Sequence, residues 1–171
     1  AGARVVVVSS GGMYNTKFPE WADATAAEGV AYNGNLAYAY AKRGQVLLCE
    51  RWAAAHPTVK CVSCHPGWSN TPAVDEAYGE MKKYLEPLRT PWEGAEGIAW
   101  LCAADAGVLQ SGGFYLDRKA ETKHIAGPFF TEGSYTKNSP AEVEVMMANL
   151  HAWANGARAL TGPQVSGLAR R

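Results

Sequence analysis

Tyr38 and Lys42 are the two side chains whose types and spacing suggest chemistry, because together they could pass a proton to or from a bound molecule. Residues four apart share one face of a helix, so the phenol and the ammonium group are expected to be neighbours. An ordinary phenol has a pKa of about 10, and proton exchange near neutral pH needs a pKa lower by about 3. A nearby ammonium group in a partly dry cleft shifts the phenol in that direction.

The spacing alone does not identify a catalytic pair, because tyrosine and lysine are common on exposed helix surfaces. The same spacing recurs at Tyr78/Lys82 and at Tyr115/Lys119. The pair at Tyr38 differs from these two, since it lies on a long predicted helix, 35–55, that follows a buried strand. Context therefore favours the first pair.

Ser10 ends that buried strand, which comprises the four consecutive valines Val5–Val8. Ligands of open α/β sheets bind outside the carboxyl ends of the strands, so the Ser10 hydroxyl is a candidate ligand contact. A serine in this position can also cap the turn that follows, and this alternative stays open.

A second strand, 58–64, is followed by the sequence His65-Pro66-Gly67-Trp68-Ser69-Asn70-Thr71-Pro72. The Pro66-Gly67 pair predicts a turn, after which backbone amides and the Thr71 hydroxyl could hold a carboxamide or a phosphate. An ordinary turn closed by Pro72 is the alternative.

Strands and helices alternate along the chain, which predicts a parallel α/β sheet with strand Val5–Val8 beside 59–62 and the latter beside 114–116. The capping boxes at Thr90 and Ser139 predict the starts of two further helices. Weak helical patterning covers 75–88, whereas 13–33 and 117–138 are expected to be long loops. The predicted domain is 1–154, with a tail at 155–171.

Three strands make a thin sheet for 171 residues, and the run of valines predicts burial on both faces of the first strand. We therefore expect a partial Rossmann-like, doubly wound sheet in which the C-terminal strands and helices are present and an N-terminal half is missing. The outer edge of Val5–Val8 is expected to pair with that half or with another protein chain.

Composition excludes several classes of protein. Sixteen basic and sixteen acidic residues give a formal net charge of +0, which argues against a nucleic-acid-binding face. No apolar run approaches the roughly 20 residues that span a bilayer. Four cysteines in a chain of this length favour a reducing compartment such as the cytoplasm or an organelle matrix.

Cys61, Cys64 and His65 spell a haem-attachment pattern, but three observations argue against it. Pro66 biases His65 away from helical angles, the preceding residues alternate as a strand, and spacing three places the two cysteines on opposite faces of the sheet. We therefore expect neither haem nor a metal here, and we expect the other two cysteines, Cys49 and Cys102, to lie in the core.

Taken in order, these motifs resemble the short-chain dehydrogenase/reductase family, and in finer detail its retinol-dehydrogenase-like branch. The resemblance covers residues 4 to about 154 and rests on Val-Ser-Ser-Gly-Gly after a strand, Tyr-Ala-x-x-Lys-Arg-x-Gln on the next helix, and His-Pro-Gly-Trp-x-x-Thr-Pro after the next strand. It implies that Ser10 binds the substrate carbonyl, that Tyr38 donates the proton, and that Lys42 holds the nicotinamide ribose.

The same resemblance implies a nicotinamide cofactor, NADP or NAD, with its nicotinamide side bound by Lys42 and by the loop residues Pro66, Gly67, Trp68 and Thr71. The expected function is an oxidoreductase acting on a small carbonyl or alcohol substrate. The family's Gly-rich phosphate loop is expected to precede Ala1. A different class stays open, namely a dehydrogenase-derived domain that serves as a non-catalytic structural or interaction subunit of a larger assembly.

Overall fold

The computed structural model describes residues 2–126 and 132–156. It divides into two compact units, each described by itself: residues 1–12 with 45–123, and residues 13–44 with 124–171. Helix α2 (Gly34–Ala55) contributes to both units. The predicted tail, 155–171, lies outside the described residues from residue 157 onward.

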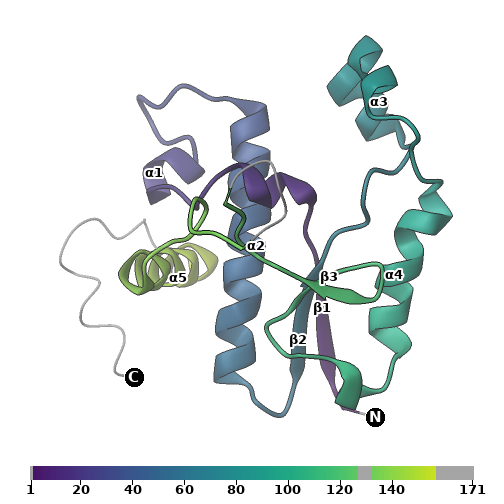
Figure 1. The fold of residues 1–171 in the computed structure, drawn as a ribbon. Coiled ribbons are helices and arrows are strands. Elements are labelled where there is room, and N and C mark those ends of the chain that lie inside the picture. The colour runs from purple at the N-terminus through teal and green to yellow at the C-terminus, as the bar shows by residue number, and fades with distance from the viewer. Residues whose placement is uncertain (1, 127–131, 157–171) are drawn as a thin grey trace. The chain divides into compact units, whose positions relative to one another are not determined.

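The first unit contains a four-stranded sheet in the order β1-β2-β3-β4 (Figure 1). Its strands are β1 (Arg4–Val8), β2 (Lys60–Cys64), β3 (Phe114–Leu116) and β4 (Lys119–Glu121). Strands β1, β2 and β3 are parallel, and Val6 pairs with Val62 in the register of the first two. The predicted strand order is confirmed, and the fold is α/β.

Strand β4 corrects the expectation of three strands and of a loop throughout 117–138. It pairs antiparallel with β3 across a turn formed by Asp117 and Arg118. Both turn residues have positive φ, +49° and +66°, and two such residues give the backbone twist that a tight hairpin needs. Glycine or asparagine usually signals such a turn, and neither occurs here.

Helices cover both faces of this sheet, as a doubly wound arrangement requires. Helix α4 (Pro91–Ala103) packs against β1, and its capping box is formed by Thr90 and Glu93. Arg4 of β1 donates to the carbonyl oxygens of Leu101 and Ala104 at the end of this helix, at 3.0 and 2.6 Å. The core on this face contains Val62, Cys64, Leu101, Leu109 and Tyr115.

The C-terminal half of α2 lies on the other face, where buried Cys49 is close enough to Cys61 of β2 for the two thiols to interact. Strand β1 is outermost, and Val5 and Val8 are 38% and 40% exposed. In the described structure β1 pairs with a strand on one side only, its other edge being unpaired. The valines of β1 are therefore less buried than the sequence predicted.

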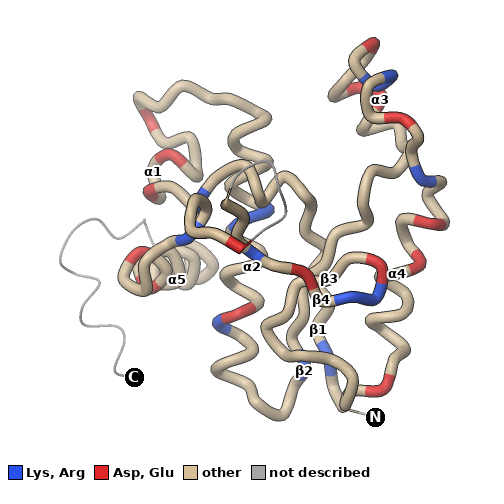
Figure 2. Tube along the Cα trace, viewed as in Figure 1, with Lys and Arg blue, Asp and Glu red and all other residues tan. Residues whose placement is uncertain are grey.

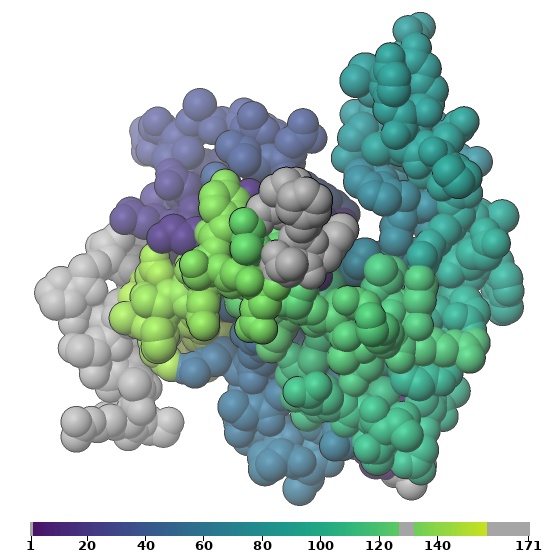
Figure 3. Space-filling view, in the orientation of Figure 1, coloured from purple at the N-terminus to yellow at the C-terminus, as the bar shows by residue number. Residues whose placement is uncertain are grey.

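Between β2 and α4 the chain leaves the sheet. Helix α3 (Pro72–Tyr78) and the 3₁₀ helix η2 (Gly79–Tyr84) form a lobe that stands off from the rest of this unit, so the helix expected over 75–88 is shorter and broken (Figure 3). A short 3₁₀ helix, η3 (Ala106–Val108), precedes β3. The charged residues of α4 are all acidic, whereas the β3–β4 hairpin carries both acidic and basic residues (Figure 2).

The second unit contains α1 (Trp21–Ala24), the first half of α2 and α5 (Pro140–Ala154). The 3₁₀ helix η1 (Gly11–Asn15) and α1 interrupt the predicted loop 13–33. The predicted capping box of α5 is present, formed by Ser139 and Glu142. Among the described residues, no helix combines the length and the apolar character needed to cross a membrane.

Candidate functional site

Ser10 lies two residues after β1, at the carboxyl end of the sheet. The neighbouring Ser9 is buried, and its amide donates to the carbonyl oxygen of Cys64 at 2.7 Å, which extends the strand pairing by one residue. Ser10 Oγ accepts a hydrogen bond from the Gly12 amide at 3.2 Å. The hydroxyl thus caps the turn and, as a half-buried group, keeps further hydrogen-bonding capacity.

Tyr38 and Lys42 lie on the same side of α2. Lys42 Nζ is 5.5 Å from the centroid of the Tyr38 ring, within the range of a cation–π contact. The Tyr38 side chain is 51% exposed, whereas the next residue, Ala39, is buried. The side chains of Tyr38 and Lys42 therefore lie beside the buried face of the helix, which includes Ala39.

Arg43, the residue after Lys42, is fully buried. Its Nη2 donates to Thr136 Oγ1 at 2.7 Å and its Nε to the carbonyl oxygen of Thr16 at 3.3 Å. These bonds fix the rotation of α2 about its axis within the second unit, and hence the direction in which Lys42 points. Nothing in the sequence pattern indicated that this one arginine, on a helix rich in alanine, would be buried.

The loop after β2 has a turn at Gly67, whose φ is +73°. The Gly67 amide donates to His65 Nδ1 at 3.2 Å, and the His65 ring stacks on Phe114 with centroids 5.3 Å apart. Burial, and then the positive charge of Arg89, lower the pKa of His65, so the neutral imidazole that accepts this bond is favoured.

The remaining loop residues are placed as follows. Trp68 is 49% exposed and meets Tyr78 edge to face, with ring centroids 5.3 Å apart. Thr71 is the N-cap of α3 but makes no side-chain cap hydrogen bond, so the helix does not use its hydroxyl. Pro66 is half-buried, and its carbonyl oxygen accepts from Arg89.

The predicted site residues are divided between the two units. Ser10 and the loop residues belong to the first unit, where both follow the carboxyl ends of neighbouring parallel strands, whereas Tyr38 and Lys42 belong to the second. Within the second unit Tyr38 lies beside Lys42, and within the first unit Ser10 and the Pro66 loop follow the carboxyl ends of the paired strands β1 and β2.

The two other Tyr-x-x-x-Lys pairs have structural partners of their own. Lys82 forms an ion pair with Asp75 and donates to Asn70 Oδ1 at 2.6 Å. The Tyr115 ring lies in the core of the first unit, and its hydroxyl accepts from the Gln110 amide at 2.8 Å. These contacts account for both pairs without a ligand.

All four cysteines carry free thiols. The Cys61 thiol interacts with Cys49 of α2 and the Cys64 thiol with Cys102 of α4, so the two β2 cysteines face opposite sides of the sheet. Burial is the main cause that raises the pKa of Cys49 to about 12 and of Cys64 to about 11. Cys102 is exposed, which corrects the expectation that it belongs to the core.

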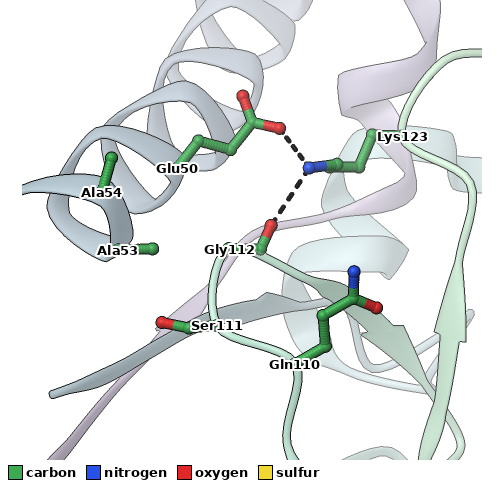
Figure 4. Close-up of a pocket in the computed structure, with 7 residues that line it drawn as sticks. All are labelled: Glu50, Ala53, Ala54, Gln110, Ser111, Gly112 and Lys123. Atoms are coloured by element: carbon green, nitrogen blue, oxygen red, sulfur yellow. Dashed lines mark hydrogen bonds and ion pairs between the residues drawn. The ribbon is translucent and has the colours of Figure 1, made fainter. Parts of the chain in front are cut away.

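A shallow pocket that the sequence did not indicate lies at the opposite, amino end of the sheet in the first unit (Figure 4). Lys123 Nζ forms an ion pair with Glu50 and donates to the carbonyl oxygen of Gly112 at 3.1 Å. The lysine, the glutamate and the Gly112 carbonyl oxygen thus bind one another, and the Gln110 side chain also lines the pocket. Within the described residues, three or more His, Cys, Asp or Glu side chains nowhere gather as a metal site would require.

Comparison with known proteins places this α/β chain among relatives of the short-chain dehydrogenases/reductases. It is 39% identical over 146 residues to the human protein dehydrogenase/reductase SDR family member 12 and 40% identical to the cattle protein of that name. In both comparisons the match covers 84% of this chain and 44% of the relative. The chain thus spans less than half the length of the curated relatives it matches, and the resemblance inferred from its motifs is confirmed.

Two further similarities are more distant. A Streptomyces protein named as a daunorubicin C-13 ketoreductase, DnrU, is 28% identical over 141 residues, which cover 80% of this chain and 47% of that protein. A crystal structure of an uncharacterised protein from Mycobacterium paratuberculosis matches with a TM-score of 0.55 and 18% identity, over 94% of this chain and 53% of that one. The latter supports the fold alone. No family model matches the chain.

Proposed function

We propose that this chain carries the catalytic residues of an NAD(P)-dependent oxidoreductase of the short-chain dehydrogenase/reductase type, which acts on a small carbonyl or alcohol substrate. The observation that carries the proposal is the placement of Tyr38 and Lys42 on one side of α2, with the ammonium nitrogen 5.5 Å from the ring centroid. The 39–40% identity to members of this family supports the class of reaction.

In the proposed reaction Tyr38 passes a proton between its phenol oxygen and the oxygen of the substrate. Deprotonation leaves a negative charge on that phenol, and the Lys42 ammonium group on the same side of the helix stabilises it. Buried Arg43 holds the helix in the rotation that keeps the two groups together. Ser10 donates its hydroxyl proton to the substrate oxygen while accepting from the Gly12 amide.

The donor set after β2 fits the carboxamide of a nicotinamide ring. The turn at Gly67 has the positive φ of a tight loop, and the Thr71 hydroxyl is not used as a helix cap. We assign Pro66, Gly67, Trp68 and Thr71 to the nicotinamide side and Lys42 to the ribose. When bound, the nicotinamide supplies or accepts a hydride, and the residues of this chain orient its ring at the carboxyl end of the sheet.

The test is Tyr38→Phe, with Tyr40→Phe on the same helix as the matched control. Turnover of a panel of aldehydes and ketones is followed by the loss of NADPH or NADH absorbance. Removal of the phenol hydroxyl is expected to lower kcat by a factor of about 10² to 10⁴ with little change in KM, because a proton donor acts in the transition state. Turnover of the Tyr38→Phe protein at the rate of the Tyr40→Phe protein would contradict the proposal.

A second candidate function is an interaction role for β1. This strand is the outermost of the described sheet, and Val5 and Val8 remain 38% and 40% exposed. An apolar outer strand favours addition of a further strand, either from the same polypeptide or from another chain. Val5→Lys is expected to weaken such pairing, which crosslinking at β1 measures. Unchanged crosslinking of the lysine variant would exclude the strand as a pairing edge.

A further inference from the structure

Arg89 lies in the irregular segment before α4, and its backbone is hydrogen-bonded to the loop that follows β2. The Arg89 amide donates to the carbonyl oxygen of Trp68 at 2.8 Å, and the Asn70 amide donates to the carbonyl oxygen of Arg89 at 2.7 Å. Ser69, between the two, pairs with Arg89 as an isolated parallel bridge. The loop is thus attached to residue 89 much as one strand is attached to another.

The Arg89 side chain covers the tightest point of the same loop. Its Nη1 donates to the carbonyl oxygen of Pro66 at 3.3 Å. A Cβ atom on Gly67 would lie only 2.8 Å from both Nε and Cζ of Arg89, so the guanidinium occupies the space that any other side chain would need. One residue therefore contacts the loop at Pro66, Gly67 and Trp68.

Asp117, in the β3–β4 turn, holds this guanidinium in place. Its two carboxylate oxygens accept from Nη1 and Nη2 of Arg89 at 2.5 and 2.6 Å, a bidentate pair that fixes the plane of the guanidinium. The hydrogen bond from Arg89 holds the pKa of Asp117 below its usual range, so the carboxylate is charged at neutral pH. The loop after β2 is in this way tied to the hairpin after β3.

We propose that Arg89 and Asp117 are positioning residues for the Pro66–Thr71 loop, and that by fixing this loop they set the affinity for the nicotinamide end of the cofactor. The second part rests on the proposed function. Neither residue is assigned contact with the reacting atoms. A partly exposed ion pair that served only to stabilise the fold would leave the mobility of the loop unchanged when removed.

The experiment compares Arg89→Met and Arg89→Lys with Arg118→Met as the matched control. Arg118 follows Asp117 in the β3–β4 turn and forms an ion pair with Glu96 of α4, not with the loop after β2. The first readout is amide hydrogen exchange at Gly67 and Asn70, which requires no enzymatic activity. The second is KM for NADPH or NADH, measured separately from kcat.

Arg89→Met is expected to accelerate exchange at Gly67 by about tenfold, since it removes a charge-assisted contact, and Arg118→Met is expected to leave it within about twofold. KM for the dinucleotide should rise by a similar factor, with kcat changed less. Arg89→Lys keeps the charge without the bidentate geometry, so its exchange rate at Gly67 and its KM should lie between those of wild type and Arg89→Met. Asp117→Asn serves as a second route to the same loosening if Arg89→Met fails to fold.

Unchanged exchange at Gly67 and Asn70 in Arg89→Met and Asp117→Asn would overturn the inference, whatever the activity. Accelerated exchange with an unchanged KM would overturn its second part, the link to the cofactor. A third outcome is that exchange is accelerated in the variants but the wild-type protein itself does not oxidise NADPH or NADH. This outcome would support the positioning role and count against the proposed function. The two readouts therefore separate the failure of one proposal from the failure of the other.

Discussion

An ion pair stands at each end of the sheet in the first unit. At the carboxyl end, the ion pair of Arg89 and Asp117 contacts the loop after β2. At the amino end, the ion pair of Lys123 and Glu50 contacts the turn before β3. Each pair also reaches a backbone carbonyl oxygen, that of Pro66 in one case and that of Gly112 in the other. The two ends therefore use the same kind of contact to attach an irregular segment to the sheet.

The difference lies in what each pair leaves unused. At the carboxyl end the arginine contacts one side of the loop, while the Thr71 hydroxyl stays out of the helix cap and Trp68 is half exposed. At the amino end the lysine, the glutamate and the carbonyl oxygen bind one another within a single pocket (Figure 4). Our assignment of the functional site to the carboxyl end is supported by the general rule that ligands of α/β sheets bind outside the carboxyl ends of the strands.

Two glycines with positive φ provide the most direct test of this comparison and the largest expected effect. A Cβ added at Gly67, with φ +73°, would lie 2.8 Å from the Arg89 guanidinium, whereas a Cβ added at Gly112, with φ +80°, would be in ordinary contact with Ala53 at 3.5 Å. Gly112→Ala should lower the free energy of unfolding by about 1–2 kcal/mol through backbone strain. Gly67→Ala should cost about 1–3 kcal/mol more, because overpacking adds to the strain.

Urea denaturation of both variants measures the difference. In an Asp117→Asn background the guanidinium is less firmly held, so the extra cost of Gly67→Ala should shrink while that of Gly112→Ala stays the same. Equal losses of stability in Gly67→Ala and Gly112→Ala would show that the Arg89 guanidinium adds no overpacking at Gly67.

Gly94 and Ser69 give the next largest effect. A Cβ on Gly94 in the first turns of α4 would collide with Ser69 Oγ, a buried hydroxyl with no hydrogen-bond partner among the described residues. Gly94→Ala alone should destabilise by about 1–2 kcal/mol. In a Ser69→Ala background the collision with Oγ is gone and a tight approach of 3.2 Å to the Cβ of residue 69 remains, so the cost should fall to about 0–0.5 kcal/mol because alanine is the better helix former. A double-mutant cycle by thermal unfolding measures this coupling, and an unchanged cost in the Ser69→Ala background would contradict it.

The amino-end ion pair should have a smaller effect. Lys123→Met and Glu50→Gln are each expected to lower the free energy of unfolding by about 0.5–1 kcal/mol, since both side chains are only partly buried. Neither should change amide exchange at Gly67. Faster exchange at Gly67 in Lys123→Met would instead show that the Lys123–Glu50 ion pair also affects the loop after β2.

The smallest expected effect is the acid sensitivity of the carboxyl-end pair. The hydrogen bond from Arg89 lowers the pKa of Asp117 below the ordinary value of 3.8. A carboxylate with a lowered pKa contributes stability above its unfolded-state pKa and loses it as the pH falls through the folded-state pKa. Wild type should therefore lose stability more steeply below about pH 4 than Asp117→Asn, as urea midpoints across a pH series would measure. Parallel curves would contradict this.

The parts of the fold that follow from local patterns could be predicted. Four consecutive valines specify a strand, and the two capping boxes at Thr90 and Ser139 specify where α4 and α5 begin. The order of the three parallel strands followed from their alternation with helices. Ser10 and the Pro66 loop were placed at the carboxyl end of the sheet for the same reason.

What depends on distant contacts could not be predicted. Strand β4 exists because Asp117 and Arg118 adopt positive φ without a glycine between them, so the usual signal of a hairpin is absent. Arg43 is charged and looks like a surface residue, yet Thr16 and Thr136 accept its hydrogen bonds in the interior of the second unit. Arg89 meets Asp117 across 28 residues of sequence, and no local pattern encodes that pairing.

The cysteines differ in accessibility, and this has a practical consequence for labelling. Cys49, Cys61 and Cys64 are buried with raised pKa values, whereas Cys102 is exposed on α4. Since the thiolate is the reacting form, a maleimide at neutral pH will attach to Cys102 first. A fluorophore or spin label can therefore be placed at one defined point of the first unit without removing any cysteine. A second label introduced on α5 would then report the distance between the two units in solution.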